Sequence, residues 1–287
     1  MNTKSGFVTI FGKPNAGKST LINALLSFNL SIVNRKVQTT RDRILGVLTE
    51  DNYQIVFIDT PGIIEPKYEL QKFMLNEIRT SLTEADLIIQ IVDTLNINID
   101  ELKKTDSDYK ELLLNKRRII VLNKIDLMKT DNLLPIMERL KNEFNFDEIV
   151  PVSALEHENI EELKKIILKY IPEGEFFYDK DTLTDKPEKF FVSEIIREKI
   201  LGMYHEDIPY SIMVGITEFK DRGNNLVYIN ADIIVERESQ KIIVIGNKGA
   251  GLKKLGERAR KDIENCLNKK VYLELFVKVR KDWRNNK

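Results

Sequence analysis

The chain has 287 residues, of which 42% are hydrophobic and 31% are charged. Its 45 basic and 45 acidic side chains give a formal net charge of zero. A chain of this length exceeds one average domain and can bury its cores without metals or disulfides, so we expect two domains. The single cysteine, Cys266, excludes an intrachain disulfide and fits a reducing compartment. Because the sequence has neither a bilayer-spanning apolar stretch nor a signal-peptide pattern, we expect a soluble, cytoplasmic protein.

Short apolar runs alternate with helical patterns over residues 1–172. The runs are residues 7–11, 55–58, 87–92, 119–122 and 149–152. This alternation is typical of a doubly wound α/β domain with a mostly parallel sheet. Each run ends in a polar or glycine-containing turn, and ligands of such sheets lie beyond the carboxyl ends of the strands. We therefore predict a ligand site at that edge.

The first turn is a phosphate-loop motif, G-x-x-x-x-G-K-S, placed between a strand and a predicted helix over 19–26. The candidate nucleotide-binding residues here are Gly12, Lys13, Pro14, Asn15, Ala16, Gly17, Lys18, Ser19 and Thr20. The backbone N–H groups and the helix N-terminus would form an anion site. Lys18 would reach the β- and γ-phosphates, and the Ser19 hydroxyl would ligate Mg²⁺. A purely structural glycine turn is the alternative, which the strand and helix on either side disfavour.

Two further turns fit a site for a nucleoside triphosphate. Asp59, Thr60, Pro61 and Gly62 follow the second apolar run. The Asp59 carboxylate would hold Mg²⁺ through water, and the Gly62 N–H would face the γ-phosphate, so this segment would respond to its loss. The polar loop before it has two adjacent hydroxyls. We favour Thr40 over Thr39 as the Mg²⁺ ligand, and an ordinary Ser/Thr turn remains the alternative.

The fourth apolar run leads into Asn123, Lys124 and Asp126, which identify the base. The Asp126 carboxylate can accept hydrogen bonds from the ring N–H and the exocyclic amine of guanine, whereas adenine offers an acceptor there and no amine. This pattern disfavours an ATP-dependent enzyme. Lys124 would lie along the base and bind back to the phosphate loop. Ser153, Ala154 and Leu155, after the last run, would offer a backbone N–H to the guanine carbonyl.

The second domain differs in pattern and charge. We predict a linker over 173–189, which is polar and contains prolines, and a domain over 190–287. Residues 186–287 hold 21 basic and 15 acidic side chains, an excess that is typical of a nucleic-acid-binding domain. The pattern predicts helices over 190–204 and 250–267 and strands over 211–219, 227–235, 241–245 and 271–279.

A second glycine loop, Gly246, Asn247, Lys248 and Gly249, precedes the predicted basic helix. Glycines allow a sugar-phosphate chain to come close, and KH domains clamp about four nucleotides of single-stranded RNA with such a loop. The helix supplies Lys253, Lys254 and Arg258 as candidate RNA-binding residues. A simple turn at a helix start is the alternative. We expect Ile242 and Ile245 to lie in the core rather than under bases.

These motifs, in this order, resemble the bacterial Era family of GTPases over nearly the whole chain. The resemblance is strongest over residues 36–41, 193–199, 244–250 and 275–279. It implies a Ras-like α/β P-loop GTPase domain with a mostly parallel sheet, followed by an α+β type II KH domain. It also implies a role in assembling the 30S ribosomal subunit by binding near the 3′ end of 16S rRNA. Relatives often continue beyond the position of Trp283, so contacts of such a tail are not carried over.

The family pattern implies GTP, GDP and Mg²⁺ as ligands and Lys18, Thr40, Asp59 and Gly62 as catalytic residues. Many GTPases orient the attacking water with a glutamine after Gly62, but this chain has Ile63 there. We therefore predict slow intrinsic turnover, at or below roughly 10⁻⁴ to 10⁻³ s⁻¹. Asn15 resembles the asparagine that some related GTPases use to hold K⁺.

Alternatives from other classes remain open at this stage. The chain is either a GTP-hydrolysing switch or a KH-type RNA-binding protein that holds GTP or GDP as a structural or regulatory ligand. The second alternative stays open because Ile63 stands in place of the glutamine that orients the attacking water in many GTPases. Peripheral membrane association gains little support, because the sequence contains no heptads or lipid anchor. We expect a monomer.

Overall fold

The computed structural model describes residues 3–34, 36, 39–205 and 207–285. The chain forms two compact units, one of Met1–Lys67 and Gln71–Asp185 and the other of Tyr68–Leu70 and Lys186–Lys287. Within the described part of the chain, no helix combines the length and the apolar character that crossing a membrane requires.

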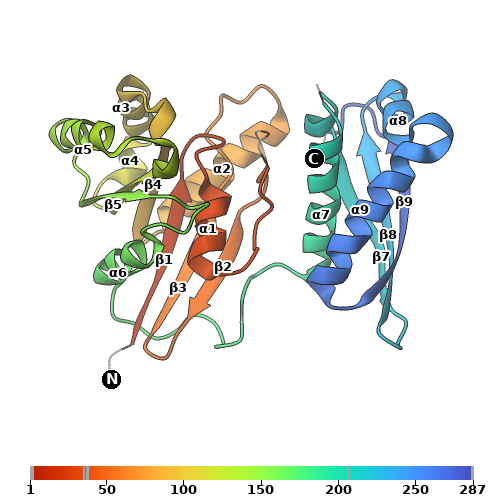
Figure 1. The fold of residues 1–287 in the computed structure, drawn as a ribbon, viewed down its shortest axis with the longest axis horizontal. Coiled ribbons are helices and arrows are strands. Elements are labelled where there is room, and N and C mark those ends of the chain that lie inside the picture. The colour runs from red at the N-terminus through yellow and green to blue at the C-terminus, as the bar shows by residue number, and fades with distance from the viewer. Residues whose placement is uncertain (1–2, 35, 37–38, 206, 286–287) are drawn as a thin grey trace. The chain divides into compact units, whose positions relative to one another are not determined.

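The first unit is built around a six-stranded sheet in the order β2-β3-β1-β4-β5-β6 (Figure 1). Its strands are β1 (Lys4–Phe11), β2 (Ile44–Thr49), β3 (Tyr53–Asp59), β4 (Leu87–Asp93), β5 (Arg117–Asn123) and β6 (Glu148–Val152). The five predicted strands and the mostly parallel sheet are confirmed. The sequence analysis missed β2, an edge strand that runs antiparallel to β3.

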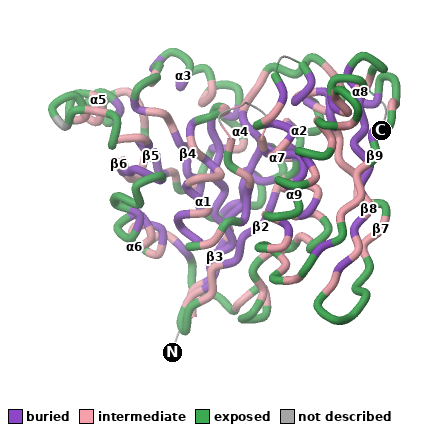
Figure 2. Tube along the Cα trace, turned by 45° about the vertical axis from the view of Figure 1, so that its right-hand side comes forward, coloured by how far each residue is buried: buried purple, intermediate pink, exposed green. Residues whose placement is uncertain are grey.

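Continuous apolar sequence explains the central strands, because helices cover both faces of a parallel sheet and bury every position. Ile88, Ile89 and Ile91 of β4 are completely buried, and Figure 2 shows the sheet as the buried centre of this unit. The helices are α1 (Lys18–Leu26), α2 (Glu69–Glu84), α3 (Ile99–Asp108), α4 (Lys110–Leu113), α5 (Thr130–Glu143) and α6 (Ile160–Tyr170). The 3₁₀ turns η1 (Thr94–Asn96) and η2 (Ile125–Leu127) follow β4 and β5.

Residues 173–185, here called the strap, end the first unit and pack beside its sheet. The buried side chain of Gln54 accepts hydrogen bonds from the N–H groups of Phe177 and Tyr178 at 2.8 and 3.0 Å and donates to the Tyr178 carbonyl at 2.9 Å. Farther along, the Val47 N–H donates to the Leu183 carbonyl at 2.9 Å. The strap therefore runs beside the edge strand β2 and satisfies part of its backbone.

The second unit is a three-stranded sheet in the order β7-β8-β9 with helices on one face (Figure 1). Its elements are α7 (Glu188–Met203), η3 (Ile208–Tyr210), β7 (Met213–Asp221), β8 (Leu226–Val235), α8 (Glu238–Ile245), η4 (Asn247–Gly249), α9 (Ala250–Leu267) and β9 (Lys270–Val279). β7 is antiparallel to β8, and β8 is parallel to β9. Ile196, Ile229, Val244 and Ile263 are fully buried in the core between the helices and the sheet.

The predicted strand over 241–245 is wrong, because these residues form the end of helix α8. The four apolar residues 242–245 have the same pattern in a buried strand and a buried helix, so periodicity could not separate the two. The local hydrogen bonds decide it. The Gln240 side chain accepts from the N–H groups of Glu236 and Arg237 at the start of the helix, and Gly246 ends it.

Candidate functional site

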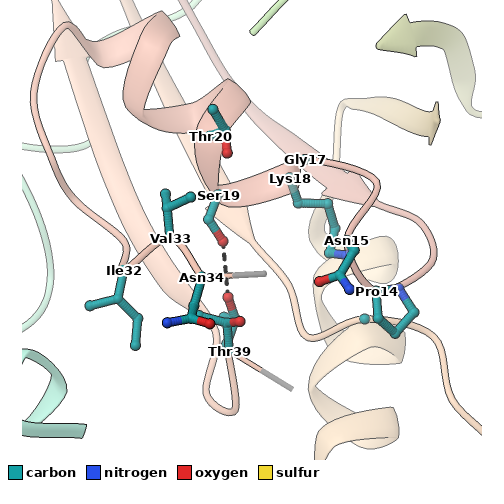
Figure 3. Close-up of a pocket in the computed structure, with 12 residues that line it drawn as sticks. Pro14, Asn15, Gly17, Lys18, Ser19, Thr20, Ile32, Val33, Asn34 and Thr39 are labelled. Atoms are coloured by element: carbon teal, nitrogen blue, oxygen red, sulfur yellow. Dashed lines mark hydrogen bonds between the residues drawn. The ribbon is translucent and has the colours of Figure 1, made fainter. Parts of the chain in front are cut away.

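The phosphate loop connects the end of β1 to the start of α1, with Gly17 immediately before the helix. Gly17 has φ 101°, and a Cβ atom there would lie 2.1 Å from the side-chain nitrogen of Asn123, so only glycine fits. Figure 3 shows Pro14, Asn15 and Lys18 on one side of the pocket that this loop forms, with Ser19 facing the segment of Asn34 and Thr39. Thr20 and Gly62 also line this pocket.

Lys18 is buried at the centre of the loop. Its ammonium donates hydrogen bonds to the carbonyls of Gly12 at 3.1 Å and Lys13 at 2.8 Å. Burial lowers the pKa of Lys18 to about 8, although the charge of Asp59 acts in the opposite direction. A phosphate group would stabilise this poorly solvated cation, which is the chemistry expected of a phosphate-loop lysine.

Three oxygen-bearing side chains meet beside the loop. The Ser19 hydroxyl donates to one Asp59 carboxylate oxygen at 2.9 Å, and the Thr40 hydroxyl lies 3.1 Å from the Ser19 hydroxyl and 3.2 Å from the same oxygen. The other Asp59 oxygen is buried and has no hydrogen-bond partner among the described residues. Burial raises the pKa of the Asp59 carboxyl, and the surrounding hydroxyls and Lys18 offset only part of this effect.

This oxygen cluster suits Mg²⁺, which prefers hard oxygen ligands and would satisfy the unpartnered carboxylate oxygen. The structure places Thr40 in the cluster, whereas the Thr39 hydroxyl donates to the Lys36 carbonyl at 2.8 Å. Two residues of the family motif over 36–41, Val37 and Gln38, lie outside the described residues.

The segment after Asp59 lies against the phosphate loop. The Thr60 hydroxyl donates to the Ile10 carbonyl at 2.8 Å, and a Cβ atom on Gly62 would come within 2.8 Å of the Pro14 ring. Next to it, the Ile63 N–H donates to the Gly12 carbonyl at 3.1 Å. The Ile63 side chain is partly buried and packs against the apolar cluster that includes Ile78. The position that follows Gly62 thus carries an aliphatic side chain that packs on this cluster.

Asn123 joins three motifs that are far apart in the sequence. Its side-chain nitrogen donates to the Ala16 carbonyl at 2.8 Å, and its side-chain oxygen accepts from the Ala154 N–H at 3.0 Å. The side chain is 97% buried, since only 3% of the residue is exposed. Asn123 therefore fixes the base-recognition turn between the phosphate loop and the end of β6.

The tie to the phosphate loop that we predicted for Lys124 is made by Asn123 instead. The Lys124 ammonium donates to the Asp93 carboxylate at 2.7 Å, a partner that the sequence analysis missed. Asp126 is exposed in η2, and Leu155 is 70% exposed, so both lie at the surface of the first unit. Ser153 is completely buried, and its backbone pairs with that of Glu158.

Two residues of the phosphate loop occupy its outer side. Asn15 is exposed with φ 63° and lines the pocket near Lys18. Lys13 forms an ion pair with Glu101 of α3. The Lys13 side chain is thus held towards α3, and only its carbonyl contacts Lys18.

The second glycine loop forms the turn between α8 and α9. Lys248 and Gly249 have left-handed backbone conformations, with φ 50° and 82°. A Cβ atom on Gly246 would lie 2.8 Å from the backbone nitrogen of Gly251, so the chain folds tightly on itself here. The Tyr204 hydroxyl donates to the Val244 carbonyl at 2.9 Å, a buried contact that holds the end of α8. The sequence analysis missed this contact, because it read 241–245 as a strand.

An exposed cationic and apolar surface surrounds this loop. Asn247, Lys248, Lys253, Lys254 and Arg258 are exposed, and the charged ones form no ion pair with the described part of the chain. The expectation that Ile242 lies in the core is wrong, because it is 69% exposed on α8. Ile243 is 52% exposed, while Ile245 packs against the core as expected.

Comparison with known proteins identifies both domains. The family described as 50S ribosome-binding GTPase matches residues 7–124, and the KH domain family matches residues 207–284. A solved structure of Era in complex with MgGDPNP and nucleotides 1506–1542 of 16S ribosomal RNA is 45% identical to this chain, with a TM-score of 0.92. The similarity covers 99% of this chain and 96% of that one.

The chain belongs to the Era family. A variant of Aquifex aeolicus Era bound to GDP.AlF₄⁻ shows the same 45% identity, coverage of 99% and 96%, and TM-score of 0.92. As an Era protein, the chain is a GTPase with a P-loop GTPase domain followed by a KH domain. The oxygen cluster around Asp59 belongs to the first domain, and the loop at Gly246 to the second.

Proposed function

We propose that this protein hydrolyses GTP to GDP and phosphate and uses the bound nucleotide to control an RNA-binding KH domain during assembly of the 30S ribosomal subunit. The observation that carries the proposal is the cluster of Ser19, Thr40 and Asp59, which takes one oxygen ligand from the start of α1, one from the loop before β2 and one from the end of β3. A cluster of this kind changes when a γ-phosphate is lost, so it suits a switch.

In the proposed mechanism the phosphate loop and Lys18 hold the phosphates, while Ser19 and Thr40 ligate Mg²⁺ directly and Asp59 through water. Bound Mg²⁺ would neutralise charge that develops on the transferred phosphoryl group. The Gly62 N–H would bind the γ-phosphate, and Gly62 lies close to Pro14 of the phosphate loop. Lys18, Thr40, Asp59 and Gly62 then act by positioning and charge stabilisation.

Guanine specificity rests on Asp126, helped by the stem of Lys124 and the backbone of Ser153, Ala154 and Leu155. The fixed position of Asn123 between Ala16 and Ala154 supports this assignment, because it sets the distance from the phosphates to the base. Changing Asp126→Asn should move the preference from guanine to xanthine nucleotides, and unchanged preference in a competition assay would place the base elsewhere.

The turnover without a partner should be slow. Ile63 packs into an apolar cluster and cannot polarise water. Asn15, exposed beside Lys18, is the proposed ligand of a K⁺ ion. The ion would stand near the phosphates in place of a positively charged side chain. Equal hydrolysis rates in sodium and potassium buffers would exclude the K⁺ role. Product formation below the detection limit in a single-turnover assay would favour the alternative, in which GTP or GDP is only a ligand.

The proposed RNA partner is the 3′ region of 16S rRNA, bound at the loop Gly246–Gly249 and along Lys253, Lys254 and Arg258. The exposed cations without ion pairs support this, and a related Era protein has been solved with nucleotides 1506–1542 of that RNA. We place the protein in the cytoplasm as a monomer that meets the 30S subunit. Binding to anionic lipid vesicles would add peripheral membrane association.

The deciding experiment measures the affinity for an oligonucleotide from the 3′ end of 16S rRNA with a GTP analogue and with GDP, at two salt concentrations. A tenfold tighter complex with the analogue corresponds to about 1.4 kcal/mol of coupling and would support the switch. The salt dependence would report the number of phosphate contacts. Equal affinities would show that the two domains act independently.

A further inference from the structure

The sheet of the second unit has one face that the helices do not cover. Along β9, side chains alternate between the two faces, so Val271 and Val277 are buried in the core while Tyr272 and Phe276 are 56% and 48% exposed. Helices α7, α8 and α9 pack on the core side, as does the glycine loop between α8 and α9. The uncovered side is therefore a separate surface from the one around Gly246.

Three planar groups form a row on this uncovered side. The Arg222 guanidinium lies 4.3 Å from the ring centroid of Tyr228, and the ring of Tyr228 stacks on that of Tyr272 with centroids 5.9 Å apart and planes inclined by 20°. The register of β8 and β9 pairs the two tyrosines directly. The Tyr228 hydroxyl also donates to the Glu274 carboxylate at 2.7 Å, which fixes the ring.

The row has one open end. β9 is an edge strand, since the sheet order is β7-β8-β9, and Tyr272 stands on it. Tyr228 covers one side of the Tyr272 ring, and no other aromatic ring of the described residues stacks on it. The exposed side of Tyr272 is thus a preformed platform for one more planar group.

The charges around this row favour an anionic ligand. The acidic side chains of the uncovered face have partners there: Asp232 pairs with Lys278 at 2.6 Å, Glu218 pairs with Lys220, and Glu274 accepts from Tyr228. Lys270 and Arg222 are exposed, and within the described residues neither pairs with a carboxylate. The cations left without a carboxylate therefore flank the tyrosine row.

We propose that this aromatic face, made of Arg222, Tyr228, Lys270, Tyr272 and Phe276, is a second contact for single-stranded RNA. One base stacks on Tyr272, and Lys270 and Arg222 pair with neighbouring phosphates. Proteins that bind single strands combine aromatic stacking with cationic side chains in this way, whereas the cores of protein interfaces are depleted in charge. The inference rests on the proposed RNA function and adds a surface remote from the glycine loop.

The test compares Tyr272→Ala with the ring-retaining control Tyr272→Phe on two RNAs from the 3′ end of 16S rRNA. One RNA has about four nucleotides, the length that a G-x-x-G loop clamps, and the other is roughly three times longer. Tyr272→Ala should weaken binding of the longer RNA about tenfold, within the range for loss of one stacked base, and leave the shorter RNA unaffected. Tyr272→Phe should bind both like the wild type. Equal binding of the longer RNA by Tyr272→Ala would overturn the inference.

A fluorescence experiment gives an independent readout. Trp283 is the only tryptophan and is buried, so Tyr272→Trp adds an exposed reporter. The longer RNA should quench its emission, and the absence of quenching in a complex that forms would refute stacking. Gly249→Asp, which changes only the glycine loop, should weaken binding of the shorter RNA. If the wild type binds neither RNA, the proposed RNA function is wrong. If the wild type binds and Tyr272→Ala binds the longer RNA equally well, only the aromatic face is excluded as an RNA contact.

Discussion

Replacing Asn123 by alanine tests whether one buried side chain assembles the nucleotide site. The change removes two hydrogen bonds, of 2.8 Å to the Ala16 carbonyl and 3.0 Å from the Ala154 N–H. Because Asn123 is only 3% exposed, both backbone groups would be left with little access to water. Each unsatisfied buried group costs about 1–3 kcal/mol, so the total is about 2–6 kcal/mol. This is a large part of the 5–15 kcal/mol that stabilises a typical domain.

We therefore expect Asn123→Ala to lower the melting temperature of the first unit and to weaken GDP binding at least tenfold, because the loop must be reordered by the ligand. The assays are thermal unfolding by circular dichroism and titration with a fluorescent GDP analogue, each with Asn132→Ala as the control. Asn132 is exposed on α5, so its replacement should change neither value.

A second variant separates the two hydrogen bonds. Asn123→Asp keeps the acceptor for the Ala154 N–H but places a carboxylate oxygen against the Ala16 carbonyl, so it should also weaken GDP binding. The reasoning would be refuted if Asn123→Ala bound GDP within twofold of the wild type and melted at the same temperature. Such a result would mean that the three motifs hold their positions without this contact.

Three further predictions follow from individual contacts. Gln54→Leu removes three part-buried hydrogen bonds to the strap backbone and, at about 0.5–1.5 kcal/mol for each, should lower stability by about 1.5–4.5 kcal/mol. It should also speed proteolysis within 173–185, whereas an unchanged cleavage rate would show that the strap is held by other contacts. Burial acts to raise the pKa of Asp93, but hydrogen bonds, above all from Lys124, outweigh it and hold the pKa below its ordinary value. The pair therefore adds stability above pH about 3.9 that is lost as the pH falls through the lower folded pKa. Asp93→Asn should reduce stability at neutral pH and flatten the acid limb of an unfolding curve, and two superimposable curves would contradict this. Thr40→Ala should slow Mg²⁺-dependent GTP hydrolysis at least tenfold while Thr39→Ala does not, and a reversed order of the two rates would assign the ligand to the other hydroxyl.

The nucleotide site could be predicted from the sequence because its motifs are formed by residues close together in the chain. The phosphate loop needs Gly17 and Lys18 within eight residues because its backbone has to curl around an anion, and the curl depends on residues that are neighbours in sequence. The donor and acceptor pattern of guanine likewise requires a carboxylate such as Asp126. The apolar runs before these motifs are long and buried on both faces, so five of the six strands of the first sheet were predicted correctly.

Segments with ambiguous patterns were predicted less well. Residues 242–245 are apolar in a way that fits helix and strand equally, and the helix is shown only by the hydrogen bonds of Gln240 and the one from the Tyr204 hydroxyl to the Val244 carbonyl. β2 was not predicted although four of its six residues are apolar, because Gly46 interrupts the run and a glycine inside a strand weakens its pattern. Ile242 was misplaced for the same reason as its helix, since a wrong period assigns side chains to the wrong face.

The sequence by itself determined the ligand chemistry, the two kinds of domain and the order of their motifs, because each depends on residues close together in the chain. Only the tertiary structure decided which groups meet: Thr40 with Asp59, Asn123 with the Ala16 carbonyl, and Tyr228 with Tyr272. These partners are separated by 19, 107 and 44 positions. Packing of the whole domain brings them together, and no local preference of the backbone encodes such a contact.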